Sequence, residues 1–148
     1  QGLPAFLAGD PGLESGLMIA QVTACDLLGE MRVLAHPASC DSVPTSANQE
    51  DHISMGLAAA RKLRRSVTCL QYVAAVELAA AAQALEHRRP LRGGVGVEAT
   101  HAAVRRSVAP LDGDRSLSRE LEELRVRIAA GDFRTGVLDP DDDSPSLT

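Results

Sequence analysis

The side chains best suited to chemistry lie together in one polar loop, at about residues 36–54. Near its end a carboxamide, two carboxylates and an imidazole follow in immediate succession: Gln49, Glu50, Asp51 and His52. A carboxylate can accept a substrate N–H or assist a proton transfer. Because Pro37 and Pro44 interrupt helical geometry in this segment, we expect a loop that presents these side chains. This loop is the candidate functional site.

Glu50 and Asp51 also have a simpler structural interpretation. They stand just before a long apolar segment, where a helix begins and leaves backbone N–H groups unpaired. An acidic side chain at that end of a helix can act as a cap, which contributes about 0.5–2 kcal/mol to stability and needs no catalytic role. The residues alone leave both interpretations open.

Other residue types give weaker signals. The histidines lack a spacing that pairs two ligands on one helix face, so we expect no metal site: His36, His52, His87 and His101. The cysteines are odd in number and lack C-x-x-C spacing, which indicates reduced packing residues: Cys25, Cys40 and Cys69. The glycine clusters at 9–12 and 93–96 lack the context of a phosphate loop and are interpreted as turns.

Two long helices must position the polar segment. Apolar residues recur every three or four positions over residues 14–35 and again over about 54–87. The second helix would be about 50 Å long, whereas a compact domain of this size has a diameter near ~40 Å. We therefore expect a helical assembly larger than this chain, with neighbours along the whole length of this helix. The apolar seam of the second helix comprises Leu63, Val67, Leu70, Ala74, Leu78, Ala81 and Leu85.

Two shorter helices are predicted in the second half of the chain. One covers residues 97–108, and the other begins near Ser116 and ends at a C-terminal cap, Gly131. The apolar stripe of the last helix is Leu117, Leu121, Leu124 and Ile128. The acidic tail at 139–148 is expected to be disordered.

Composition restricts the class of protein. The chain has 148 residues, 45% of them hydrophobic, but only two Phe, one Tyr and no Trp. This favours an all-α protein with closely packed helices over a β-sandwich. A net charge of −5 argues against a nucleic-acid partner. We find no unbroken apolar run of about 18 residues and no signal peptide, which predicts no membrane partner and a cytoplasmic location.

Four blocks of sequence occur in one order and spacing: GLPAFL at 2–7, ESGLMIAQVTA at 14–24, AHPAS at 35–39 and DSVPTSANQEDHISMG at 41–56. In these blocks the chain resembles histidine ammonia-lyases, members of the aromatic amino acid ammonia-lyase family. The resemblance implies an all-α homotetramer, in which long antiparallel helices of each chain contribute to a central helical bundle of the larger assembly. It implies deamination of L-histidine to trans-urocanate and ammonia. It also implies an electrophilic prosthetic group, 4-methylideneimidazol-5-one, formed from an internal Ala-Ser-Gly.

The sequence departs from a complete enzyme in two places. It contains no Ala-Ser-Gly, the nearest tripeptide being Ala38-Ser39-Cys40, and its one tyrosine, Tyr72, matches no catalytic motif. The resemblance therefore implies that residues 1–138 are the C-terminal helical segment of a lyase. The electrophile would lie on an N-terminal lyase polypeptide, so this chain has no cofactor-binding residue and is expected to be inactive alone. Tyr72 is interpreted as a packing residue.

The resemblance also assigns a role to Glu50. In Asn48-Gln49-Glu50-Asp51-His52 it matches the family's active-site glutamate, which contacts the substrate imidazole and assists proton transfer. Gln49 is a neighbouring candidate for substrate hydrogen bonds, and Asp51 and His52 are expected to organise the loop. Phenylalanine and tyrosine lyases typically have Gln at this position, so Glu50 favours histidine. Two alternatives stay open: part of a phenylalanine or tyrosine lyase or aminomutase, and a non-catalytic helical assembly module.

Overall fold

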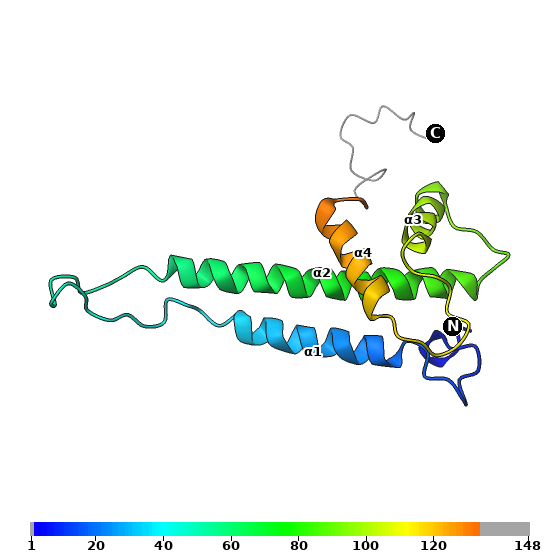
Figure 1. Cartoon of the computed structure of the whole chain (residues 1–148), viewed down its shortest axis with the longest axis horizontal. Coiled ribbons are helices and arrows are strands. Elements are labelled where there is room, and N and C mark those ends of the chain that lie inside the picture. Colours follow the sequence, from blue (N-terminus) through cyan, green and yellow to red (C-terminus); the bar gives the residue numbers. More distant parts are fainter. Residues whose placement is uncertain (1, 134–148) are drawn as a thin grey trace, which may run out of the picture.

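The computed structural model describes residues 2–133 and shows an elongated, helical molecule (Figure 1). A short 3-10 helix, η1, precedes four α-helices: η1 is Ala5–Leu7, α1 is Met18–Leu34, α2 is Gly56–Glu86, α3 is Val95–Arg105 and α4 is Ser118–Ala130. Within the described residues there is no β-strand, only an isolated bridge between Thr45 and Glu50. The all-α prediction is confirmed. The tail expected at 139–148 lies outside the described residues.

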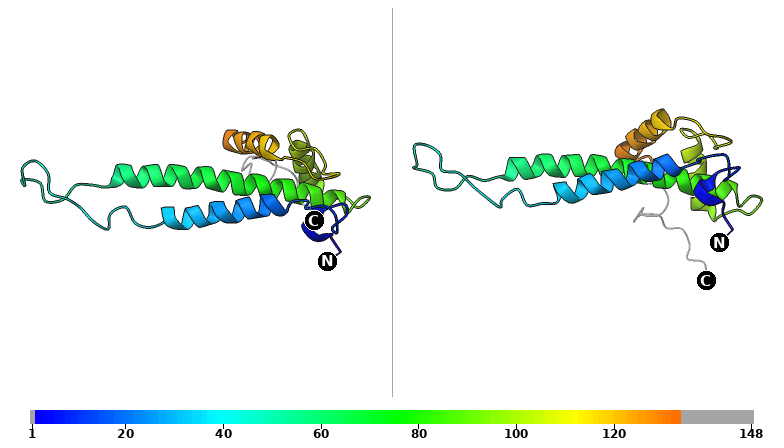
Figure 2. Two further views of the ribbon diagram at one scale, coloured as in Figure 1. Left: turned by 60° about the horizontal axis from the view of Figure 1, so that its bottom comes forward. Right: turned by 90° about the horizontal axis from the view of Figure 1, so that it is seen from below.

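Helices α1 and α2 are antiparallel and lie side by side in every view (Figures 1 and 2). The predicted long helix is confirmed, because α2 has 31 residues, about 46 Å of helix. Helix α1 begins at Met18 rather than near Glu14, because the Glu14 carboxylate instead accepts the N–H groups of Gly9 and Asp10. Gly16, with φ +52°, also breaks helical geometry there.

The core lies where α3 and α4 pack on the C-terminal half of α2. Its buried residues are Ala75, Ala79, Ala82, Val104, Val108 and Leu124. The small alanine side chains of α2 allow the other two helices to approach closely, since the distance between helix axes depends on the side chains at the contact. We call residues 69–133 the hub.

This chain buries the predicted apolar seam of α2 only in part. Leu63, Val67 and Leu70 are exposed and Leu78 packs against the core, whereas the alanines beside the seam are covered by α3 and α4. The smaller side chains are buried because they permit the closer contact. In contrast, the stripe predicted for α4 is confirmed, with Leu124 fully buried and Leu121 and Ile128 packed against the core.

The predicted cap of α4 is also confirmed. Gly131 adopts φ 88°, in the left-handed region, and its N–H bonds to the carbonyl of Ile128 at 3.0 Å. Glycine has no Cβ to clash in that conformation. The other predicted boundaries differ slightly: α3 begins at Val95 and ends at Arg105, and α4 begins at Ser118.

The other end of the molecule is built differently. We call residues 29–68 the arm: the end of α1, the interhelical segment 35–55 and the first part of α2. No residue of the arm is buried in this chain. Its exposed large apolar side chains are Val33, Val43, Leu57, Leu63 and Val67. In Figure 1 the arm extends away from α3 and α4, with the interhelical segment at its tip.

Helix α2 is long and apolar enough, by length and composition, to cross a membrane. An 18-residue window within it has a mean hydropathy of 1.3. This corrects the expectation from the sequence, which counted only unbroken apolar runs. Core helices of helical proteins have the same property, and 28% of this window is buried within the chain.

Candidate functional site

The interhelical segment 35–55, which carries the candidate residues, is held by two hydrogen bonds near the ends of α1 and α2. Helix α1 ends at Leu34, before Pro37, and the next helix begins at Gly56. The Lys62 ammonium donates a hydrogen bond to the carbonyl of His36, and the N–H of Ile53 donates to Ser42 Oγ at 3.0 Å. These two hydrogen bonds connect the beginning of the interhelical segment to its end and to α2. They hold the two sides of the loop together below its tip.

The tip is a tight reversal of the chain. Thr45 and Glu50 exchange two main-chain hydrogen bonds, of 2.9 Å from Thr45 N to Glu50 O and 3.2 Å from Glu50 N to Thr45 O. Between them, Gln49 N donates to the carbonyl of Ser46 at 3.2 Å. Ser46, Ala47 and Asn48 have φ values of 54°, 55° and 65°. Glu50 is therefore held through its main chain.

The Glu50 side chain extends from this tip without a partner. Glu50 and Gln49 are both exposed, and within residues 2–133 the Glu50 carboxylate makes no hydrogen bond or ion pair. The capping interpretation of Glu50 and Asp51 is wrong, because Met55 is the N-cap residue of α2 and the first N–H of the helix, that of Gly56, bonds to Ser54 Oγ at 3.2 Å. The carboxylate is thus available to bind a group from outside the described chain.

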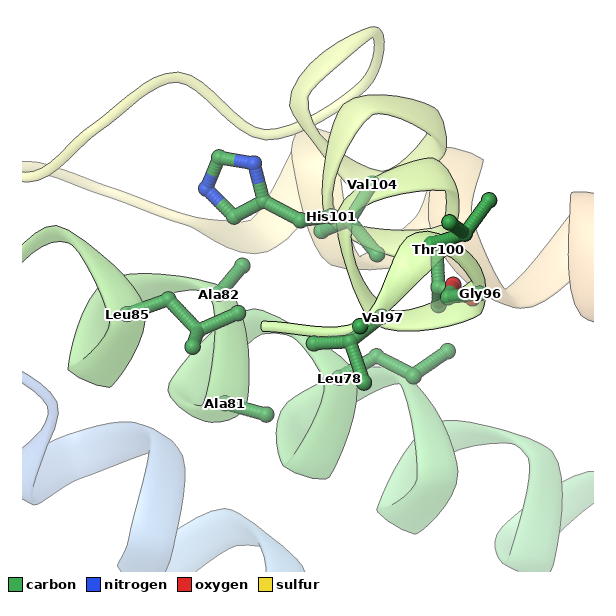
Figure 3. Close-up of a pocket in the computed structure, with 11 residues that line it drawn as sticks. Leu78, Ala81, Ala82, Leu85, Gly96, Val97, Thr100, His101 and Val104 are labelled. Carbon is green, nitrogen blue, oxygen red and sulfur yellow. The ribbon is translucent and has the colours of Figure 1, made fainter. Parts of the chain in front are cut away.

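A second possible site is an apolar cavity of about 390 Å³ between α2 and α3. Figure 3 shows Leu78 and Leu85 of α2 facing Val97 and Val104 of α3, with the His101 ring at the margin. Thr100 and His101 are the polar side chains that line it. The lining has no carboxylate and cation pair to hold an amino acid, so this cavity is a poor candidate for an amino acid site.

His101 instead belongs to a cluster of charges at the end of α2. His101 Nε2 lies 2.8 Å from Glu86 Oε1, and Arg105 Nε donates to the same oxygen at 3.0 Å. Burial raises the pKa of Glu86, but the hydrogen bonds from His101 and Arg105 outweigh it and hold that pKa below its ordinary value. Sequence analysis missed this cluster, since only packing of α3 on α2 brings these residues together.

Tyr72 is half-buried in the middle of α2, as expected of a packing residue. Its hydroxyl donates to Glu122 of α4, and the Arg125 guanidinium lies 5.2 Å from the ring centre. The hydrogen bond to Glu122, aided by burial, raises the pKa of Tyr72. Tyr72 also lines a groove of about 740 Å³ between α1, α2 and α4. It joins two helices of the hub and is separate from Glu50.

The cysteines match their predicted state only in part. None of the three forms a disulfide, but only Cys69 is buried, while Cys25 and Cys40 are exposed on the described chain. Cys69 lies against the Glu30 carboxylate, and burial raises the pKa of its thiol. In residues 2–133 no three His, Cys, Asp or Glu side chains come together to hold a metal ion.

Comparison with known proteins now adds to this geometry. A family model described as aromatic amino acid lyase matches residues 1–106. The chain belongs to this family. The histidine ammonia-lyase of Symbiobacterium thermophilum is 52% identical over 136 residues, covering 92% of this chain and 27% of that protein. For that of Deinococcus radiodurans the identity is 51%, covering 89% of this chain and 25% of that protein.

Solved structures of lyase family members have the same fold. The crystal structure of histidine ammonia-lyase from Trypanosoma cruzi matches with a TM-score of 0.84 and 40% identity, covering 88% of this chain and 26% of that one. Tyrosine aminomutase from Streptomyces globisporus matches with a TM-score of 0.85 and 41% identity, covering 90% and 26%. The chain thus spans about a quarter of the length of the lyase family members that it matches.

Proposed function

We propose that this chain is the C-terminal part of a histidine ammonia-lyase and that it supplies Glu50 to a composite active site. The exposed Glu50 carboxylate, without a partner in residues 2–133 and held on a closed turn, carries the proposal. Identity of 52% with a protein named histidine ammonia-lyase supports it. The reaction converts L-histidine to trans-urocanate and ammonia: a C–N and a C–H bond break and a C=C bond forms.

The carboxylate of Glu50 is chemically suited to bind a substrate that has an imidazole ring. An ionised carboxylate accepts hydrogen bonds, an imidazole N–H donates one, and an imidazolium would be stabilised by the adjacent negative charge. Glu50 would therefore orient the substrate ring and assist proton transfer. Gln49, exposed beside it, can both donate and accept a hydrogen bond to the substrate.

The prosthetic group implied by the family would have to come from other polypeptide. Formation of 4-methylideneimidazol-5-one requires Ala-Ser-Gly, and the nearest tripeptide here ends in Cys40, whose side chain does not suit the cyclisation. An N-terminal lyase polypeptide would supply this electrophilic group. We further propose that the assembly is a tetramer in the cytoplasm, in which protein covers the apolar face of α2.

The similarity to tyrosine aminomutase supports a second candidate. Its TM-score and identity are nearly equal to those of the Trypanosoma cruzi histidine ammonia-lyase. Glu50 favours histidine over phenylalanine, because its carboxylate can accept an imidazole N–H and a phenylalanine ring has no donor. A tyrosine hydroxyl can also donate to a carboxylate, but only an imidazolium would add a positive charge beside Glu50. A non-catalytic helical module is the remaining candidate. Substrate choice and activity in a complete assembly separate these functions.

The test is urocanate formation, followed by ultraviolet absorbance, with L-histidine as substrate. The chain is assayed alone and after co-expression with an N-terminal lyase chain that contains Ala-Ser-Gly. We expect activity only in the co-expressed assembly. Glu50→Gln should lower kcat at least about 100-fold, the usual scale for loss of an acid–base group. Asp51→Asn is the matched control and should retain activity, because the Asp51 carboxylate is exposed and, contrary to the expectation that it organises the loop, makes no hydrogen bond or ion pair in residues 2–133.

Other outcomes would redirect the proposal. Turnover of L-tyrosine or L-phenylalanine in place of L-histidine would favour the aminomutase or aromatic lyase. A folded assembly that acts on none of the three amino acids would favour the non-catalytic module. Full activity of Glu50→Gln would show that Glu50 has no role in the reaction.

A further inference from the structure

The turn before Glu50 has an unusual main-chain conformation. Of the five non-glycine residues with positive φ in residues 2–133, three are consecutive: Ser46, Ala47 and Asn48. For an L-residue this conformation brings Cβ too close to the following carbonyl oxygen. Asn tolerates it better than most residues, but Ala47 has no side-chain hydrogen bond to compensate. The surrounding contacts must therefore impose the conformation on this turn.

The hydrogen bonds of the turn show what its left-handed conformation accomplishes. Gln49 N bonds to Ser46 O, so Ala47 and Asn48 are the central residues of a four-residue turn. Positive φ at both central residues gives this turn the left-handed, mirror-image form. Thr45 and Glu50, which flank residues 46–49, are paired by two main-chain hydrogen bonds. The left-handed conformation is thus the one in which the chain reverses and Glu50 meets Thr45.

We propose that this left-handed turn, with Ala47 at its centre, positions the Glu50 carboxylate. The proposal rests on the proposed function of Glu50. The Glu50 side chain has no partner in residues 2–133, so within this chain its main chain alone directs it. That main chain is fixed by the bonds to Thr45, which form only while residues 46–49 reverse the chain. Ala47 is thus a positioning residue, which acts through Glu50.

Two substitutions of Ala47 separate conformation from side-chain size. Valine is β-branched and is strongly disfavoured at positive φ, so Ala47→Val should open the turn and displace Glu50. Glycine adopts positive φ freely, so Ala47→Gly should preserve the turn. Ala38→Val is the matched control, because Ala38 lies in the same interhelical segment but is not among the described residues with positive φ.

The experiment is a double-mutant cycle in the co-expressed assembly, with kcat and KM for L-histidine as the readout. Each variant is made with Glu50 present and in the Glu50→Gln background. With Glu50 present, we expect Ala47→Val to lower kcat/KM about tenfold or more, and Ala47→Gly and Ala38→Val to stay within about twofold. In the Glu50→Gln background, Ala47→Val should change kcat/KM less than about twofold, because the group it positions is gone.

A role in folding alone would give a different pattern. Equal losses from Ala47→Val in both backgrounds would overturn the proposal, as would equal losses from Ala47→Val and Ala47→Gly. Circular dichroism and size-exclusion chromatography check that each variant folds and assembles. If Ala47→Val does not, Asn48→Ala is the milder variant, with an expected loss of a few fold that again requires Glu50.

Failure of the proposed function is a separate result. An unmodified assembly without histidine turnover, or one indifferent to Glu50→Gln, would remove the proposed function and this inference together. An active, Glu50-dependent assembly in which Ala47→Val and Asn48→Ala are harmless would remove only the inference.

Discussion

The hub and the arm contain parts of the same helix, α2, but use it in opposite ways. In the hub α2 presents alanines to α3 and α4 and buries them, while in the arm it leaves Leu57, Leu63 and Val67 exposed. Both parts are apolar, so composition does not separate them. The difference is that α3 and α4 of this chain cover α2 in the hub, whereas they do not cover it in the arm.

The difference bears on where stability and chemistry reside. The hub has a buried core and a network of hydrogen bonds, so it should hold the free energy of folding available to the chain alone. The arm carries Glu50 on a pinned turn but has no buried residue. Under the proposed function, the rest of a lyase would cover the arm and complete the site. The following predictions test this division.

The largest effect is expected from a buried leucine. Leu124 is fully buried between α4 and α2, so Leu124→Ala should lower the free energy of unfolding by about 2–5 kcal/mol. Leu63 in the arm is 65% exposed, so Leu63→Ala should change it by no more than about 0.5 kcal/mol. Urea denaturation followed by circular dichroism measures both, and similar losses would contradict the division.

A buried amide should give the next largest effect. Gln83 Nε2 donates to the carbonyl of Leu111 at 3.0 Å, while its Oε1 accepts from Leu111 N and from Arg105. Gln83→Leu keeps the side-chain volume but leaves the Leu111 main chain and Arg105 without these hydrogen bonds. We expect it to lower the free energy of unfolding, measured by urea denaturation, by about 1–3 kcal/mol. Thr68→Val removes an exposed hydroxyl bond in the arm and serves as control. If Thr68→Val lowered the free energy of unfolding as much as Gln83→Leu, the proposed difference in stability between the hub and the arm would be wrong.

The pH dependence of stability should report the contact between α2 and α4. The hydrogen bonds from Arg125 and then Tyr72 lower the pKa of Glu122 from 4.5 to about 2. A folded-state pKa below the unfolded value means that this stabilisation is complete above about pH 4.5 and is lost as pH falls toward about 2. In Glu122→Gln the midpoint of urea denaturation should depend less on pH between about 4.5 and 2 than in the unmodified chain. An unchanged profile would show that the contact does not stabilise the fold.

The smallest effect is expected at the ion pair of the arm. Arg65 and Glu30 form a bidentate pair with N–O distances of 2.6 and 2.8 Å, but their side chains are 50% and 36% exposed. Solvent screening weakens such a pair. Arg65→Met should therefore change the urea midpoint only slightly, and the change should disappear at high salt. A large, salt-independent loss would instead place part of the stabilising core in the arm.

The sequence predicted some features of the site better than others. The loop between the two long helices followed from Pro37, Pro44 and the polar composition, which act locally. The capping role of Glu50 was wrong, because the helix begins at Gly56 and Glu50 instead pairs with Thr45. No pattern indicated a left-handed turn at Ala47, since Gly is the residue that usually marks such a conformation.

By itself the sequence determined the helices of this protein, since three- and four-residue periodicity and the Gly131 cap are local properties of the chain. It also determined that a carboxylate stands between the long helices. Only the tertiary structure decided which face of α2 is buried and how Gln83, His101 and Tyr72 find their partners. Those contacts join residues far apart in sequence, and they depend on the distance to which whole helices can approach one another.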